Sequence, residues 1–400
     1  MILKNGFIIR NNTLVKNDIL IEEGLIKEVS DHIDVKNQEV IDVDSLLIIP
    51  GAVDVHVHYR EPGFINKETI KTGTLSAAKG GITTTLAMPN LQPCPDSLEH
   101  LKVEEEIIKK DAIIEVLPYV SLSKGEKGQE LSDLEDLCPR VVAVSDDGVG
   151  VNNVELLKEA MQICKRHHKI IASHAEDTID SKLPQGEYVA VRREIELAKE
   201  TKVKYHFCHL STKESFDAVR KAHQEGYQNI TCEVSPHHLF LNETMIKNGN
   251  FKMNPPLRSK ENQEETIKAL LDGTASLIAS DHAPHKKEEK SQAYDKCPNG
   301  IIGLETMIPL VYTNLIKTKR ATLDDFLAWL VYNPIKVFSL KERRIEPGFV
   351  ADLACLDITT EREYQEKEIL SKSTNSPYIG MKLTGFNKMT IKNGKIIWRE

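Results

Sequence analysis

Short apolar runs alternate with amphipathic stretches through the middle of the chain. The apolar runs are rich in Val and Ile and show little polar alternation, as expected of parallel strands that are buried on both faces. They predict eight strands, at residues 52–55, 83–87, 113–117, 141–144, 170–172, 204–207, 229–233 and 276–279. The stretches between them repeat their apolar positions with the period of an α-helix. They predict helices at 66–79, 97–110, 153–167, 187–200, 212–225 and 261–271.

The eight units fall within residues 49–344 and predict an α/β fold, a (β/α)8 TIM-like barrel. Active sites of such barrels lie at the C-terminal ends of the strands. An open doubly wound sheet is the alternative. No GxGxxG or GxxxxGK[ST] segment follows any of the predicted strands, so nothing in the sequence indicates a nucleotide site.

The two ends of the chain have a different pattern. Residues 1–48 form short alternating apolar runs broken by turn signals, and residues 389–398 predict a hairpin across Asn393-Gly394. Neither end has enough strands for a stable separate domain. We therefore predict one small β-domain assembled from residues 1–48 and 345–400, beside a catalytic barrel of residues 49–344.

Composition limits the classes of partner. The chain has 400 residues, of which 40% are hydrophobic and 28% charged, as in ordinary globular proteins. The net charge of −8 and the pI near 6.0 argue against nucleic acid or an anionic membrane as a partner. The start lacks signal-peptide features, no stretch has the ~18 apolar residues of a membrane span, and the seven cysteines form no CxxC pair. We expect a cytoplasmic protein that acts on a small molecule.

Polar side chains that can bind metal follow five of the predicted strands. They are His56 and His58 after the first strand, Asp146 and Asp147 after the fourth, His174 after the fifth, His209 after the sixth, and Asp281 after the eighth. In a barrel all these positions open on one mouth. Imidazole and carboxylate together suit a partly open zinc site. A lone buried His is usually a packed core residue, but that interpretation would have to hold independently at each of these strand ends.

Some neighbouring polar residues are better explained by structure. Because side chains alternate along a strand, Asp146 and Asp147 cannot both face the metal. The histidine pair at 237–238 is interpreted as structural, and the pair at 167–168 and His206 as helix-end or packing residues.

Longer segments carry a resemblance to a known family. The chain resembles the dihydroorotases of the amidohydrolase superfamily, specifically the long bacterial type. The resemblance implies a zinc-dependent cyclic amide hydrolase that reversibly closes N-carbamoyl-L-aspartate to (S)-dihydroorotate with release of water, the third step of de novo pyrimidine biosynthesis. The matching segments are 54–63, 67–69, 80–84, 87–90, 146–150, 208–215, 236–238, 252–258 and 280–285.

The resemblance also implies roles for individual residues. The implied ligands are His56, His58 and Asp281 for the more buried zinc, His174 and His209 for a second zinc, and Asp147 as the bridge between them. The implied substrate contacts are His58 beside the metals, Arg60, Asn90 and His285 on the carboxylate, and Asn254 and the backbone at Asn299 and Gly300 on the ring. The chain departs from the family at Asn299, where an aromatic residue is usual, and at residues 177–187, which we predict to be a shortened loop.

These roles define an expected mechanism. Zinc lowers the pKa of bound water to ~7 and can hold a carbonyl oxygen. Asp281 would act as general base and then general acid, passing a proton to the ring nitrogen. The Arg60 guanidinium fits a carboxylate, although a structural ion pair is an alternative. A turn-capping role is the alternative for Asn90.

Two rival functions remain. A dihydropyrimidinase, hydantoinase or allantoinase would carry a lysine at the end of the fourth strand, where this chain has Asp146 and Asp147. A catalytically inactive dihydroorotase-like assembly partner would have lost metal ligands, which are all present here. The sequence leaves open whether one or two zinc ions bind and whether the loop at 286–300 is a lid or a solvated surface loop. We expect a homodimer, with a possible association with aspartate transcarbamoylase.

Overall fold

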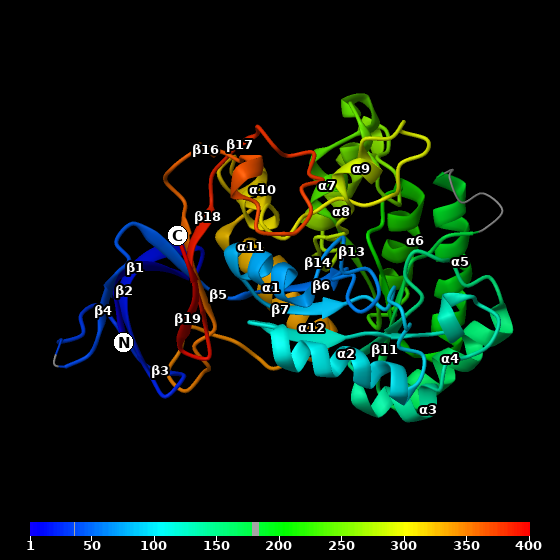
Figure 1. Cartoon of the computed structure of the whole chain (residues 1–400), viewed down its shortest axis with the longest axis horizontal. Coiled ribbons are helices and arrows are strands. Elements are labelled where there is room, and N and C mark those ends of the chain that lie inside the picture. The colour runs from blue at the N-terminus through cyan, green and yellow to red at the C-terminus, as the bar shows by residue number, and fades with distance from the viewer. Residues whose placement is uncertain (36, 178–183) are drawn as a thin grey trace.

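Eight strand positions close into a parallel barrel, as the sequence predicts. The structure is a computed structural model that describes residues 1–35, 37–177 and 184–400 (Figure 1). The barrel strands are β6 (Ala52–Val57), β7 (Ile82–Ala87), β8 (Glu115–Pro118), β9 (Val120–Ser121), β10 (Ala143–Ser145), β11 (Ile170–Ser173), β12 (Lys204–Phe207), β13 (Ile230–Val234) and β14 (Leu277–Ile278). Only Tyr119 separates β8, which pairs with β7, from β9, which pairs with β10, so these two strands share the third position. A parallel bridge from Val57 to His282 closes the ring.

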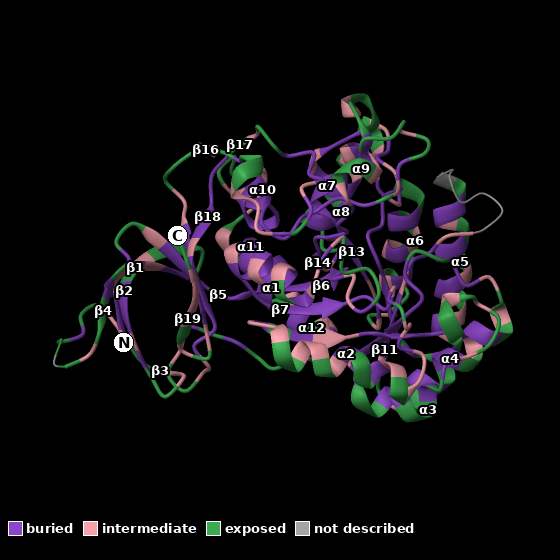
Figure 2. Ribbon diagram, in the orientation of Figure 1, coloured by how far each residue is buried: buried purple, intermediate pink, exposed green. Residues whose placement is uncertain are grey.

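Helices surround the barrel, with buried faces turned inward and exposed faces outward (Figure 2). The longer helices are α1 (Ile70–Lys79), α2 (Leu98–Asp111), α4 (Val154–Arg166), α5 (Pro184–Thr201), α6 (Lys213–Gln224) and α8 (Lys260–Leu271). The shorter ones are α3 (Leu134–Leu137), α7 (Pro236–Phe240), α9 (Lys287–Lys290), α10 (Met307–Val311), α11 (Leu323–Leu327) and α12 (Asn333–Val337). Side chains of Ser97, Asn153 and Ser259 cap α2, α4 and α8, which explains where these helices begin.

Two sequence-based helix boundaries were wrong. The predicted helix at 66–79 begins only at Ile70, because the side chain of Thr69 accepts a hydrogen bond from the Thr72 amide and ends the preceding loop. The predicted loop at 177–187 is helical from Pro184 onward. Residues 178–183 of that loop lie outside the described residues.

Both ends of the chain contribute to one further sheet, at the left of Figure 1. Its strands are β1 (Ile2–Arg10), β2 (Thr13–Glu22), β3 (Leu25–Ser30), β4 (Val40–Asp42), β5 (Leu46–Pro50), β15 (Leu353–Asp357), β18 (Phe386–Lys392) and β19 (Lys395–Arg399). The order is β19-β18-β15-β5-β1-β2-β3, with β4 on β1. The hairpin predicted between β18 and β19 is confirmed, with positive φ at Asn393 and Gly394 as a tight two-residue turn requires.

The stretch between β15 and β18 leaves this sheet and packs against the barrel. Its short strands β16 (Arg362–Glu363) and β17 (Lys382–Leu383) pair with one another. Tyr364 and Tyr378 share a buried cluster with Phe251 and Met253 of the barrel. The domain boundaries at 48/49 and 344/345 stay a prediction. Within the described residues, no helix is long and apolar enough to cross a membrane.

Candidate metal centre and active site

Six predicted metal-binding side chains converge at the mouth of the barrel. All six are buried, and each lies at or just past the C-terminal end of a strand: His56, His58, Asp147, His174, His209 and Asp281. His209 and Asp281 have φ values of +32° and +49°, a region that non-glycine residues rarely occupy. Such backbone strain is concentrated at functional sites, where it holds side chains in a required direction.

The first half of the cluster has the spacing of zinc ligands. Nε2 of His56 lies 3.3 Å from Oδ1 of Asp147, and Nε2 of His58 lies 3.4 Å from Oδ2 of Asp147. Oδ1 of Asp281 lies 3.3 Å from Nε2 of His58 and 3.6 Å from Nε2 of His56. Two ligands that each sit about 2.0–2.1 Å from a tetrahedral zinc ion lie ~3.3 Å from one another. These four side chains therefore leave room for one zinc-sized ion between them.

The second half of the cluster shares Asp147 with the first. Oδ1 of Asp147 lies 3.6 Å from Nε2 of His209 and 3.9 Å from Nδ1 of His174. Among the described residues, Nε2 of His56 and Oδ1 of Asp147 are buried without a hydrogen-bond partner. Buried polar atoms are normally satisfied, so their convergence fits a bound cation, and the shared carboxylate suits a bridge between two of them.

The charges in the cluster also favour a bound cation. Burial opposes the charge of Asp147, but His56 and His209 outweigh it and hold the pKa of Asp147 well below its usual value. Burial likewise opposes the charge of Asp281, yet the hydrogen bond from His58 and the charge of His56 lower its pKa. Both carboxylates therefore stay ionised and favour positive charge at the centre of the cluster, which a divalent cation supplies.

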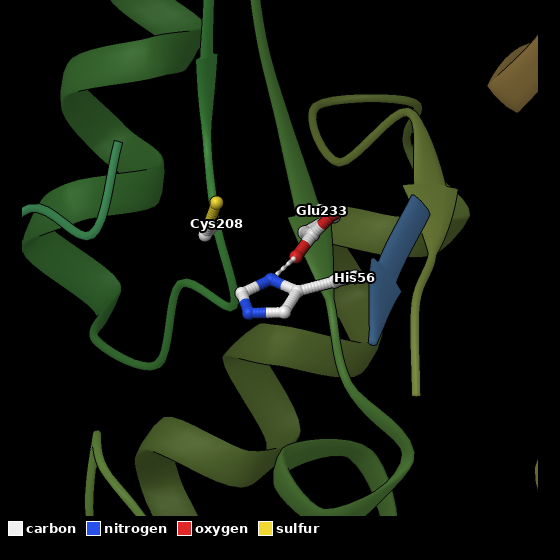
Figure 3. A group of neighbouring side chains, drawn as sticks. All are labelled: His56, Cys208 and Glu233. Carbon is white, nitrogen blue, oxygen red and sulfur yellow. Dashed lines mark hydrogen bonds and ion pairs between the residues drawn. The ribbon is translucent and has the colours of Figure 1, made fainter. Parts of the chain in front are cut away.

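Glu233 on β13 supports the cluster from behind. Its carboxylate accepts hydrogen bonds from Nδ1 of His56 (2.8 Å) and Nε2 of His206 (3.1 Å). Figure 3 shows Glu233 pointing at one ring nitrogen of His56 while the other nitrogen faces away. Cys208 lies near the same two side chains, but burial raises the pKa of its thiol well above its usual value, so the thiol stays protonated. We therefore interpret His56, Cys208 and Glu233 as the support of a metal ligand rather than as a further metal site.

Sequence reasoning missed Glu233 altogether. The available signal was a carboxylate inside the otherwise apolar run of β13, since a buried charge in a strand needs a partner. The packing role expected for His206 is incomplete, because this residue also hydrogen-bonds Glu233.

Other neighbours separate into structural and site-facing residues. Asp146 turns away from the cluster and accepts hydrogen bonds from the backbone amides of Leu122 and Ser123. His238 lies 3.0 Å from the carbonyl of Pro255, which fits its expected structural role. His237, by contrast, faces Oδ2 of Asp281 at 3.9 Å.

A cavity of about 240 Å³ opens above the metal-binding cluster. It brings together most of the residues that the sequence predicted for substrate binding: His58, Arg60, Asn90, Asn254, Asn299 and Gly300. Asp147, His174, His209 and Asp281 also line it, whereas His56 lies fully buried beneath. A small ring held in this cavity would contact the metal site and the predicted binding residues together.

Of the three predicted carboxylate-binding residues, Arg60 and Asn90 line this cavity, whereas His285 does not. His285 is in contact with Arg60, since its Nε2 lies 3.4 Å from Nη2 of Arg60. The Asn90 amide donates to the backbone carbonyl of Asp147 (2.7 Å) and to Oε1 of Glu126 (2.9 Å). Asn254 donates to Oε2 of Glu176 (3.2 Å) and lies 3.1 Å from Nε2 of His174. Glu126 and Glu176 are further residues that the sequence analysis did not identify.

Known proteins resemble this chain in sequence and in structure. A family model described as "Dihydro-orotase-like" matches residues 45–215. Proteins named dihydroorotase from Bacillus cytotoxicus and Bacillus cereus are each 42% identical to it, over 95% of this chain and 93% of theirs. An L-hydantoinase (dihydropyrimidinase) from Arthrobacter aurescens superposes with a TM-score of 0.88 at 24% identity, covering 100% of this chain and 96% of that one. A D-hydantoinase superposes with a TM-score of 0.89 at 22% identity, covering 100% and 95%.

The structural comparison and the sequence comparison support different conclusions. At these low identities the hydantoinase structures establish the shared fold, a (β/α)8 barrel with a further β-sheet, and nothing finer. The sequence likeness is closer and extends over nearly the whole chain. On that ground the chain belongs to the dihydroorotase family.

Proposed function

We propose that this chain is a zinc-dependent dihydroorotase, which closes N-carbamoyl-L-aspartate to (S)-dihydroorotate with release of water and reopens that ring in reverse. Membership of the family supports the reaction. One observation carries the choice of substrate: the guanidinium of Arg60 lines the same cavity as Asp147 and Asp281. A permanent cation beside the reacting centre suits a ring that carries a carboxylate, whereas a neutral hydantoin offers it no partner.

Zinc is the metal that the donor atoms favour. The cluster combines imidazole nitrogens with carboxylates at separations near 3.3 Å, as zinc requires. We propose that His56, His58 and Asp281 hold one ion, that His174 and His209 hold a second, and that Asp147 lies between them.

Asp281 is the residue best placed to move protons. Zinc, when bound, polarises the ring carbonyl and lowers the pKa of water to ~7. Asp281 lines the cavity as an ionised carboxylate, so it can take the proton of the attacking water and deliver it to the ring nitrogen as the amide bond breaks. In the biosynthetic direction the proton moves the opposite way: Asp281 takes it from the nitrogen that closes the ring and gives it to the leaving water. Arg60 and Asn90 hold the substrate carboxylate, while Asn254 and the backbone at Gly300 contact the ring.

The rival functions fit the site less well. A dihydropyrimidinase or hydantoinase is expected to have a bridging lysine where Asp147 occupies the shared position. An inactive assembly partner would not need six converging metal-binding side chains, nor Glu233 to orient one of them.

Zinc content measured alongside turnover tests the proposal. Purified protein should contain zinc and turn over dihydroorotate, with little turnover of the neutral ring dihydrouracil. Asp281→Ala should abolish turnover while the protein remains folded. Turnover of dihydrouracil alone would favour the hydantoinase reading, and absence of both zinc and turnover would favour the assembly partner.

We further propose that the protein is a cytoplasmic homodimer, since two-fold dimers are the commonest homo-oligomers, and that it associates with aspartate transcarbamoylase. Analytical ultracentrifugation of the chain, alone and mixed with that enzyme, tests both associations.

A further inference from the structure

We propose that Lys67 is a positioning residue for the carboxylate subsite: it fixes the tautomer of His285, so that Nε2 of His285 carries the proton and donates it to the substrate carboxylate. The inference rests on the proposed function for the identity of that carboxylate. Lys67 acts through His285 and does not itself line the 240 Å³ cavity.

The contact between the two side chains determines which nitrogen accepts. Nζ of Lys67 lies 3.1 Å from Nδ1 of His285. An ammonium group has three donors and no acceptor, so Nδ1 must present its lone pair. A neutral imidazole carries a single N–H, which is then left on Nε2.

The surroundings of His285 keep its ring neutral. Burial and the positive charges of Arg60, Lys67 and Lys290 lower the pKa of His285 to about 2. A hydrogen bond with the backbone of Asn299 raises this pKa, but by less than the other causes lower it. The geometry of the Lys67 contact, which needs a lone pair on Nδ1, agrees with a neutral ring.

The protonated nitrogen then meets a second donor. Nε2 of His285 lies 3.4 Å from Nη2 of Arg60, and a guanidinium also has no acceptor. Two donors that face one another at this distance favour an anion that can accept from both. A carboxylate brings two acceptor oxygens and can receive both hydrogen bonds. With the other tautomer, Nε2 would instead direct a lone pair at the substrate carboxylate and repel it.

Glu289 offers the competing tautomer. Its Oε2 lies 3.7 Å from Nδ1 of His285, too far for a hydrogen bond but close enough to attract a proton there if Lys67 were absent. Its Oε1 lies 3.2 Å from Nζ of Lys67 and anchors the ammonium group. The backbone amide of His285 is held separately, by Oδ1 of Asn375 at 3.1 Å. Removal of Lys67 should therefore change the proton position of His285 more than its place in the fold.

The ring nitrogens can be observed directly. We would label histidine with ¹⁵N, assign His285 by its loss in His285→Asn, and compare the wild type with Lys67→Met and Lys67→Arg. The wild type and Lys67→Arg should show Nε2 protonated and Nδ1 unprotonated. Lys67→Met should shift toward the Nδ1–H form. Lys287→Met, which removes an exposed lysine paired with Glu366, is the matched control and should match the wild type.

Kinetics provide the second measurement. Lys67→Met should raise the KM for dihydroorotate about five- to tenfold, roughly the value of one ordinary hydrogen bond, and Lys67→Arg should largely restore it. In a His285→Asn background Lys67→Met should have little further effect, because both changes act on the same hydrogen bond.

The spectra and the kinetics distinguish failure of this inference from failure of the proposed function. If the wild type has the proton on Nδ1, or if Lys67→Met keeps it on Nε2, the inference is overturned even in an active enzyme. Additive effects of Lys67→Met and His285→Asn on KM would also overturn it. If dihydroorotate is not turned over at all, the proposed function fails, while the ¹⁵N spectra still decide the tautomer.

Discussion

The carboxylate of Glu233 accepts a 2.8 Å hydrogen bond from Nδ1 of His56, and this contact decides which nitrogen of His56 faces the metal site. Burial would raise the pKa of Glu233, but the charges and hydrogen bonds of His56 and His206 lower it to about 2, so Glu233 is an anion. An anion at Nδ1 makes the opposite nitrogen a better metal ligand.

Glu233→Gln should therefore weaken zinc binding about 10- to 100-fold, as is usual when the partner of a metal-binding histidine is lost. Competition with a chromogenic chelator measures this affinity. Glu214→Gln, a change at an exposed position on α6, is the control. Equal zinc affinity in Glu233→Gln and the wild type would contradict the orienting role.

Arg60 should determine the preference for an acidic ring. Arg60→Met removes the guanidinium that lines the cavity, so the KM for dihydroorotate should rise by about tenfold or more, while turnover of dihydrouracil should not fall. Arg60→Lys should rescue only part of the loss, because an ammonium group cannot bind a carboxylate through two parallel hydrogen bonds. A similar loss of activity on both rings would indicate a structural role for Arg60.

Glu126 should compete with the substrate carboxylate. The Asn90 amide has two hydrogens, and one is held by the backbone of Asp147 and the other by Glu126. A substrate that takes a hydrogen bond from this amide must displace Glu126. Glu126→Ala should lower the KM for dihydroorotate about fivefold, roughly the value of one hydrogen bond.

Glu130→Ala provides the control for this prediction, because Glu130 lies on the same loop and pairs with Lys124 in solvent. It should leave KM unchanged. A rise in KM for Glu126→Ala would mean that Glu126 helps to bind substrate rather than competing with it.

The sequence predicted the barrel, and a cluster of polar side chains at its mouth, for physical reasons, whereas the metal-ligand role of each side chain came from the family resemblance and stays a proposal. Strands buried on both faces leave an unmistakable apolar run, and each proposed metal ligand lies at or just past the end of such a run. The partners of these ligands leave no comparable signal. Glu233 lies 177 residues from His56, and their contact depends on how distant strands align within the barrel. Glu126 was missed for the same reason, since it lies on a loop that only the fold brings beside Asn90.

Lys290 should hold the loop at 286–300 in place. Its ammonium group is buried and donates to the carbonyls of Lys252, Pro298 and Gly300. Because Gly300 lines the cavity, Lys290→Met should release the cavity wall and raise the KM for dihydroorotate several-fold. Limited proteolysis should also cut this loop faster.

Lys287→Met changes an exposed lysine on the same short helix and should affect neither measurement. If proteolysis of Lys290→Met is unchanged, the other contacts of the loop at 286–300 are sufficient to hold it in place.

Glu104 on α2 should destabilise the fold at neutral pH. Its side chain is buried, and neither carboxylate oxygen has a hydrogen-bond partner among the described residues. Burial raises the pKa of Glu104 well above its usual value. The folded protein therefore keeps this proton at pH values where the unfolded chain has lost it. The contribution of Glu104 to the free energy of unfolding should be most favourable below pH ~4.5, where the unfolded chain also keeps the proton. It should become less favourable as the pH rises, by up to about 1.4 kcal/mol per pH unit.

Glu104→Met fills a similar volume without a charge, so it should remove this penalty. Urea unfolding at pH 5 and pH 7.5 measures the difference, and the gain in stability over the wild type should be larger at pH 7.5. Glu106→Met, at an exposed position of the same helix, should change stability by less than about 0.5 kcal/mol at either pH. A gain for Glu104→Met that does not grow with pH would show that the carboxyl group of Glu104 is not the source of the penalty.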